Sequence, residues 1–185
     1  MFQILASSAD HPPSEICWMP AGTHDLNAGL VGGGNFNGKV ICDAESANAV
    51  IASFNELRSS GQRMILDIDH ENSAAAAEVT GFYWSPSRGI MARVTWLPIG
   101  ADALGNKAYS SFSPTFMANQ CTGKISGLVP GKPVGGITNF PAFKNAMPLL
   151  IAARLGDNFQ IGGNTDDAGD AIALQIRNNK LQIYE

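Results

Sequence analysis

The segment Val79–Leu97, with the sequence VTGFYWSPSRGIMARVTWL, has the pattern of two β-strands joined by a short turn. Its first half is rich in aromatic and β-branched residues, and the turn-forming run Ser85–Arg88 separates it from the second half. In the second half, apolar residues alternate with others, as in a strand with one buried face. The buried set would be Ile90, Ala92, Val94 and Trp96, with Met91, Arg93 and Thr95 opposite. The segment therefore predicts a β-hairpin with strands at Val79–Trp84 and Gly89–Leu97.

Short strand-like segments occur on both sides of this hairpin. The chain has 20 glycines and 10 prolines, which indicate many turns, so we expect short strands more than long helices. The further predicted strands are Phe2–Ala6, Glu15–Met19, Met64–His70, Ser111–Met117, Lys124–Leu128 and Gly136–Asn139.

One helix is predicted between Asp43 and Gly61. Apolar residues recur there at the i, i+3, i+4, i+7 spacing of a single buried helix face. Asp43 can cap the first turn, and Gly61 stands where a C-terminal cap belongs. A further helical turn is predicted at Ile99–Asn106, and Glu71–Glu78 is either a loop or a short helix.

The composition excludes several classes of protein. The chain has 185 residues, 45% of them hydrophobic, and a net charge of −4, which suits one domain with a core and not a disordered chain. No apolar run approaches the roughly 18–20 residues of a membrane span, and no cluster of Lys and Arg indicates nucleic-acid binding. The apolar N-terminus lacks the basic region of a signal peptide. Cys17, Cys42 and Cys121 form no close pair and predict reduced thiols in a cytosolic protein.

The character of the sequence changes after Leu155. Gly156–Gly169 is rich in glycine and aspartate and predicts a linker. Ile172–Tyr184 is either a hairpin that turns at Asn178-Asn179 or an amphipathic helix. We therefore expect a folded domain over residues 1–155 and a linker with a C-terminal tail over residues 156–185.

The stretch Gly33–Lys39 matches the G-x-x-x-x-G-K pattern of a phosphate-binding loop. Val40 follows where such a loop needs Ser or Thr to hold Mg²⁺, and no helix pattern begins directly after it. We therefore interpret Ala28–Lys39 as a flexible loop, and the sequence predicts no cofactor.

The densest group of titratable residues consists of Asp67, Asp69, His70 and Glu71. Three interpretations are open: a divalent-metal site, a solvated strand end, or a catalytic base at His70. Strand alternation would put Asp67 and Asp69 on one face and His70 on the other, so a compact metal site would need a bulge. The catalytic base is favoured, because the other histidines, His11 and His24, lie in loop-like sequence.

The segment Tyr109–Phe116 places three serines among aromatic residues. On a strand, Ser111 and Ser113 would share a face. Such hydroxyls are often only hydrogen-bonded polar positions, since a nucleophile needs a base within reach. His70 is the base that this sequence offers.

Six short blocks of the chain occur in the order in which one protein family has them. Leu66–Glu71, LDIDHE, is similar to a hydrophobic-D-x-E-H-Q motif, with Asp69 in place of Glu and Glu71 in place of Gln. Phe112–Phe116, FSPTF, is similar to L-S-P-V-F. The other blocks are Ile16–Gly22 (ICWMPAG), Gly81–Trp96, Thr122–Ile125 (TGKI) and Ile137–Phe143 (ITNFPAF). Together they resemble the Mu-like prophage I protein family, the prohead proteases of Mu-type tailed phages.

This resemblance implies a fold and an activity. The fold would be α+β, a small and mostly antiparallel β-barrel with a few flanking helices, similar to the herpesvirus assemblins. The activity would be that of a serine endopeptidase in which His70 activates Ser113 without a cofactor or metal. Its substrates would be scaffold and capsid proteins, and the chain itself, inside the assembling prohead in the host cytoplasm. Self-association is expected, and nucleic acid and membrane are not expected partners.

The third catalytic residue does not transfer from the family pattern. Related prohead proteases carry an acidic residue before the strand that ends in x-P-A, where this chain has Pro133–Gly136. Asp69 is the candidate by position in the sequence, with Asp67 and Asn139 as alternatives. Strand alternation argues against direct contact of either aspartate with the His70 ring.

Two other functions remain open from the sequence. One alternative is a non-enzymatic assembly module. Many members of the family resemble a protease fused to a long C-terminal scaffolding region, most of which would be absent from a chain that stops at Glu185. A Ser113 side chain buried away from His70 would favour that function. A metal-dependent hydrolase that uses Asp67, Asp69 and His70 is the other alternative.

Overall fold

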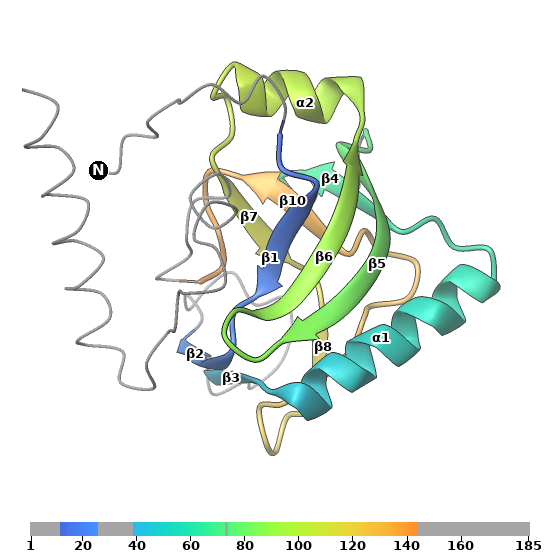
Figure 1. Ribbon diagram of the computed structural model, residues 1–185, viewed down its shortest axis with the longest axis vertical. Helices are drawn as coiled ribbons and strands as arrows, with labels where there is room; N and C mark the ends of the chain where they lie inside the picture. Colours follow the sequence, from blue (N-terminus) through green and yellow to red (C-terminus); the bar gives the residue numbers. More distant parts are fainter. Residues whose placement is uncertain (1–11, 26–38, 73, 144–185) are drawn as a thin grey trace, which may run out of the picture.

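The computed structural model describes residues 12–25, 39–72 and 74–143, which form an α+β fold (Figure 1). Its six-stranded sheet has the order β1-β6-β5-β4-β10-β7 and curls into a nearly closed barrel. These strands are β1 (Glu15–Met19), β4 (Ile65–Ile68), β5 (Ala77–Ser85), β6 (Gly89–Trp96), β7 (Ser111–Pro114) and β10 (Gly135–Thr138). Two small sheets pair β2 (Gly22–Asp25) with β3 (Lys39–Cys42), and β8 (Met117–Ala118) with β9 (Ile125–Gly127). The expected barrel is thus confirmed at the level of an α+β barrel-like sheet.

Several predictions concern segments outside the described residues. These are the strand Phe2–Ala6, most of the loop Ala28–Lys39, the linker Gly156–Gly169 and the tail Ile172–Tyr184. The division into residues 1–155 and 156–185 stays a prediction for the same reason.

The β5–β6 hairpin is the longest strand pair and confirms the hairpin prediction. It runs in register from Ala77 opposite Trp96 to Ser85 opposite Gly89, with one irregularity between Val79 and Gly81. The predicted exposure of Met91 is wrong, since its side chain is 0% exposed. Alternation of buried and exposed residues holds only where one sheet face is solvated, whereas Met91 lies in a central strand in register with Cys17 and Tyr83.

The sheet almost closes where β1 approaches β7. The two edge strands contact each other, and the Trp18 indole N–H of β1 donates to the carbonyl of Val134, just before β10, at 2.8 Å. The Trp18 ring also packs edge-on against Phe116, which follows β7, with 6.3 Å between ring centroids. A side chain therefore joins the two ends of the sheet.

The predicted helix is α1 (Ala44–Ser59), which packs on β5 and β9. Its buried face includes Ala47, Val50 and Phe54, and the Phe54 ring meets Phe82 of β5 edge-on. The N-cap prediction is confirmed, because the Asp43 carboxylate accepts from the Ser46 N–H at 2.9 Å. Gly61 has a φ of 89°, the left-handed conformation that a glycine favours just after a helix.

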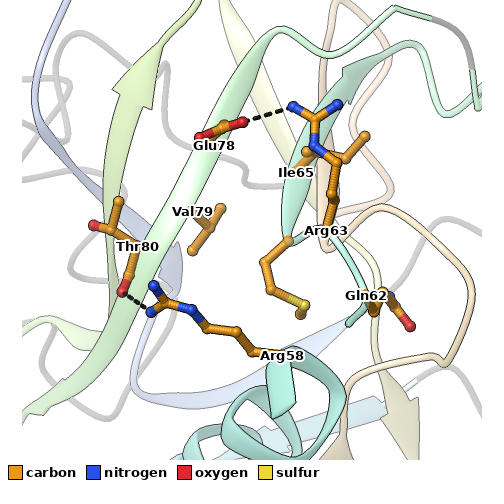
Figure 2. A pocket seen from close by; sticks show the side chains of 8 residues that line it. Arg58, Gln62, Arg63, Ile65, Glu78, Val79 and Thr80 are labelled. Atoms are coloured by element: carbon orange, nitrogen blue, oxygen red, sulfur yellow. Dashed lines mark hydrogen bonds and ion pairs between the residues drawn. The ribbon is translucent and has the colours of Figure 1, made fainter. Parts of the chain in front are cut away.

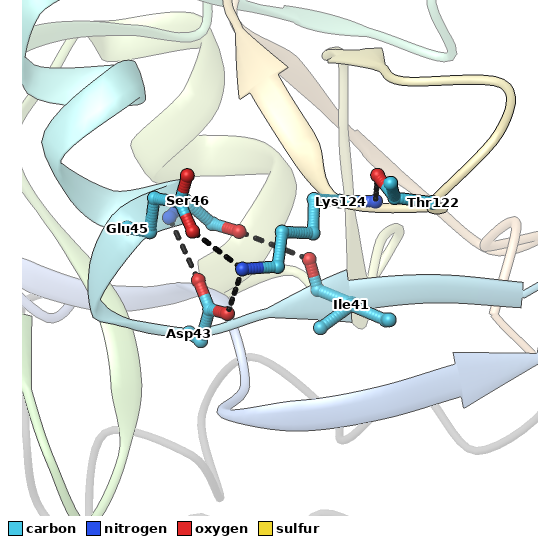
Figure 3. A network of polar contacts seen from close by, with 6 residues as sticks. All are labelled: Ile41, Asp43, Glu45, Ser46, Thr122 and Lys124. Atoms are coloured by element: carbon cyan, nitrogen blue, oxygen red, sulfur yellow. Dashed lines mark hydrogen bonds and ion pairs between the residues drawn. The ribbon is translucent and has the colours of Figure 1, made fainter.

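A polar network fixes the N-terminus of α1 to the β8–β9 hairpin (Figure 3). Lys124 Nζ lies 3.1 Å from Asp43 and 2.5 Å from Glu45, and the Ser46 hydroxyl donates to the carbonyl of Ile41. The Ser46 N–H lowers the pKa of Asp43, because it stabilises the charged carboxylate. Asp43 and Glu45 lie at the positive end of the helix dipole, which stabilises their negative charges. The ion pairs with Lys124 stabilise the same charges.

The predicted turn at Ile99–Asn106 is the helix α2 (Pro98–Gly105), which covers the end of the barrel at the top of Figure 1. The helix lies directly on backbone at Gly100, where a Cβ atom would stand 2.1 Å from the carbonyl oxygen of Ala76. Neither described helix is long and apolar enough to cross a membrane.

We expect Gly100→Ala to destabilise the fold by about 2–3 kcal/mol, because the methyl group displaces α2 from the backbone that it touches. Gly105→Ala in the same helix is the matched control, since a Cβ there meets nothing within 4 Å. Thermal unfolding followed by circular dichroism measures both variants. Equal melting temperatures for the two variants would contradict the close packing of α2.

Candidate active site

A strained turn carries His70 at the end of β4. Asp69 and His70 have φ values of 54° and 58°, and the Glu71 N–H donates to the carbonyl of Ile68 at 3.3 Å. Asn72 also has a positive φ, of 53°. Non-glycine residues in this region are uncommon and cluster at functional sites. The alternation expected through His70 is therefore wrong, because the strand ends at Ile68.

The Asp67 side chain holds this turn. One carboxylate oxygen, Oδ2, accepts from the backbone N–H of Asn72 at 2.9 Å and so closes the loop around His70. The Asp69 N–H donates to the carbonyl of Ile137, which ties the start of the turn to β10. Asp67 and β10 together fix the backbone on which His70 lies.

A row of three residues crosses the sheet beside the turn. Gly136 of β10 is in register with Ser113 on β7 and with Asp67 on β4. Residues paired in this way present their side chains to the same face of a sheet. Gly136 has no side chain, and a Cβ there would stand 2.6 Å from Asp67 Oδ1. The Asp67 carboxylate therefore occupies the space above Gly136, on the face that bears Ser113.

Both outer members of this row are buried. The exposed fraction is 0% for Asp67 and 3% for Ser113. Asp67 Oδ1 has no hydrogen-bond partner within the part of the chain that the structure describes. Burial raises the pKa of Asp67, and the Asn72 N–H and the charge of the nearby His70 ring oppose this rise.

The exposed His70 ring reaches across to the segment after β7. Its Nδ1 atom lies 3.3 Å from the Thr115 hydroxyl, and the Thr115 N–H donates to the carbonyl of Val134. Thr115 is two residues beyond Ser113, so along an extended chain the two side chains share a face about 7 Å apart. Among the described residues, no hydrogen bond joins the Ser113 hydroxyl to the His70 ring. The structure thus brings the His70 ring to the segment that directly follows Ser113.

The other candidates for the third residue have different partners. Asp69 is exposed, and its Oδ2 accepts from the Tyr109 hydroxyl at 2.9 Å. The Asn139 amide donates to the carbonyl of Ala108, and its oxygen lies 3.5 Å from the Ser110 hydroxyl. Neither side chain bonds to the imidazole in the described part of the chain, whereas Asp67 holds the backbone of the turn that carries His70.

The metal-site interpretation gains no support from this geometry. Within residues 12–25, 39–72 and 74–143, no three His, Cys, Asp or Glu side chains form a group that could hold a metal ion. Asp67 turns toward Gly136 and Asn72, and Asp69 turns toward Tyr109.

Cys17 and Cys42 are unsuited to nucleophilic chemistry. Burial raises the pKa of Cys17 and of Cys42 to about 12, so both stay thiols at neutral pH. Their sulfur atoms bond to backbone carbonyls instead.

A cavity of about 230 Å³ lies at the other end of β4 (Figure 2). Two arginines line it, but Arg63 pairs with Glu78 at 2.6 Å and Arg58 donates to the carbonyl of Thr80 at 3.4 Å. Both guanidinium groups thus have protein partners, and the cavity contains neither His70 nor Ser113.

Sequence reasoning did not identify Thr115 and Gly136 as parts of the site. The pair Gly135-Gly136 at the start of a predicted strand was the available signal, because glycine inside a strand often marks a close approach of other atoms. Thr115 carried no signal, since its contact with His70 depends on how three separate strands align.

We expect Asp69→Asn to lower the pH at which Tyr109 ionises. The hydrogen bond to Asp69 raises the pKa of Tyr109, since it stabilises the protonated phenol and the carboxylate repels the phenolate. The asparagine variant removes that charge, so the titration should move toward the ordinary value near 10. Tyrosinate absorbance against pH measures the change, and Tyr109→Phe identifies the signal. An unchanged Tyr109 titration would show that Asp69 does not hold this hydroxyl.

A comparison with known protein families places the chain. Residues 17–150 match the family described as Mu-like prophage I protein, N-terminal domain. No curated protein and no solved structure is significantly similar to the chain. The match covers more than half of the sequence and confirms the resemblance drawn from the six sequence blocks. The chain therefore belongs to the Mu-like prophage I protein family.

Proposed function

We propose that this protein is a serine endopeptidase of tailed-phage head assembly, with Ser113 as nucleophile and His70 as general base. The observation that carries the proposal is the register of β4, β10 and β7, which puts Ser113 on the same sheet face as Asp67, the residue that holds the turn of His70. A hydroxyl, an imidazole and a buried carboxylate then lie within one small region. These are the groups that acyl transfer requires.

The proposed reaction begins when the neutral His70 ring leaves Thr115 and accepts the proton of Ser113 Oγ. Ser113 attacks the peptide carbonyl, and the imidazolium then donates its proton to the departing amine. A water molecule, activated by His70, hydrolyses the acyl-enzyme. Because His70 is exposed, its ring can change rotamer on a fast timescale, and catalytic hydrogen bonds often tighten only in the substrate complex.

The proposed substrates are scaffold and capsid proteins of the phage, and the chain itself, inside the prohead in the host cytoplasm. Membership of a prophage protein family supports this setting. The proposal includes self-association and needs no cofactor, nucleic acid or membrane.

We expect Ser113→Ala to abolish covalent labelling by a fluorophosphonate, because the reagent reacts only with a hydroxyl that the protein has activated as a nucleophile. Intact-mass spectrometry measures the adduct, and incubation with the phage scaffold and capsid proteins measures cleavage. Thr115→Val and Ser111→Ala are the matched controls and should keep labelling within a few-fold of the wild type. Labelling that survives in Ser113→Ala but is lost in Thr115→Val would make Thr115 the nucleophile.

We expect the labelling rate to fall as the pH decreases through the range in which imidazole gains a proton, since only the neutral ring accepts one. His70→Gln, which has no titrating group, should label at least about 100-fold more slowly at neutral pH. A flat rate between about pH 5 and 8 in the wild type would contradict a histidine base.

A non-enzymatic assembly module is the second candidate. The burial of Ser113 and the contact of His70 with Thr115 favour it, since both leave the nucleophile without its base in this state. Under this function, Ser113→Ala would leave head assembly and capsid-protein processing unchanged. Under the protease function, the same variant would assemble heads whose proteins stay uncleaved.

A further inference from the structure

We propose that Asp67, and not Asp69, is the positioning residue of His70: its buried carboxylate fixes the turn through Asn72 and stabilises the imidazolium that forms during acyl transfer. This inference rests on the proposed function, because it assigns a role within the pair of Ser113 and His70.

The unpaired oxygen of Asp67 is the first argument. Oδ2 is used by the Asn72 N–H, whereas Oδ1 is buried and has no partner among the described residues. A buried acceptor left unsatisfied costs about 1–3 kcal/mol, and more when it is charged. The turn alone does not need the charge, since an asparagine oxygen would accept the same N–H. The charge therefore points to a task that an amide cannot perform.

The place of Oδ1 is the second argument. A Cβ on Gly136 would stand 2.6 Å from Asp67 Oδ1 and 3.2 Å from the backbone nitrogen of His70. The glycine thus leaves a pocket that the carboxylate fills, between His70 and the strand that pairs with Ser113. A larger residue at this position would push the carboxylate away from both.

The surroundings of Asp69 are the third argument. Asp69 is exposed to water, which screens its charge, and its oxygen is bonded to Tyr109. The other titratable groups around the turn are Glu71, next to His70, and Lys132, whose amine lies 3.5 Å from the Asn72 side chain. Asp67 is the one buried carboxylate among these described residues.

The decisive experiment compares Asp67→Asn with Asp69→Asn by fluorophosphonate labelling against pH, after circular dichroism has shown that both variants fold. Asp67→Asn keeps the acceptor for Asn72 but removes the charge. We expect it to label about 100- to 10,000-fold more slowly at its optimum, with the acid limb of the profile displaced to lower pH. The displacement follows because a nearby carboxylate favours the protonated ring. Asp69→Asn should label within about twofold of the wild type.

A second measurement does not depend on activity. NMR of the His70 ring in the Ser113→Ala background should show that the ring gains its proton at lower pH when Asp67 is replaced by Asn. Gly136→Ala, which keeps the charge but displaces the carboxylate, should have the same sign of effect. Gly81→Ala is its control, since a Cβ there meets nothing within 4 Å.

The outcomes separate the two proposals. A protein that labels at Ser113, with Asp67→Asn matching the wild type in rate and pH profile, would overturn the role of Asp67 and keep the protease. Labelling that does not depend on Ser113 would overturn the protease. In that case, an unchanged His70 titration in Asp67→Asn would overturn the positioning role as well.

Discussion

The parallel pairing of β4 with β10 is the contact on which the rest of the site depends. It joins Leu66–Ile68 to Gly135–Ile137 across a sequence separation of about 70 residues, so neither strand has the other nearby in the chain. The same strand β10 pairs with β7 on its other side. One central strand with a glycine at the shared position therefore sets the distance between a carboxylate on β4 and a hydroxyl on β7. The proposed role of Asp67 depends on that spacing.

The site combines features that reduce stability. The Asp67 carboxylate is buried, and one of its oxygens has no hydrogen-bond partner among the described residues. Three non-glycine residues of the turn, Asp69, His70 and Asn72, adopt a left-handed backbone conformation. Each such feature costs of the order of 1–3 kcal/mol and persists only where surrounding contacts enforce it. Here the surrounding contacts are two hydrogen bonds. The Asn72 N–H donates to the Asp67 carboxylate, and the Asp69 N–H donates to the carbonyl of Ile137. The destabilising features and the hydrogen bonds that enforce them therefore occur at the same residues, which are those with the proposed chemistry.

Local patterns predicted most of the fold, and long-range register decided the site. The hairpin and α1 were predictable because alternation, helical spacing and the Asp43 cap depend on neighbours in sequence. The extension of β4 to His70 failed because pairing with β10 and the Asp67–Asn72 bond turn the chain after Ile68. The sequence offered His70 as a base for the serines of Tyr109–Phe116, and the family resemblance singled out Ser113 among them for the proposed pair. Thr115 and Gly136 depend on the alignment of β4, β10 and β7, which no local pattern contains.

The barrel is closed less firmly where its two edge strands, β1 and β7, approach each other, and we call this line the seam. Elsewhere neighbouring strands share a backbone ladder, whereas at this seam Trp18 contributes one indole hydrogen bond and a ring contact with Phe116. Separating side chains costs less than unzipping paired strands, so we expect this line to be the weakest connection in the sheet. Ser113 lies on the strand at one side of it. A loosening of these contacts would therefore act on the strand that carries the buried hydroxyl, while the pairing of β4, β10 and β7 needs no change.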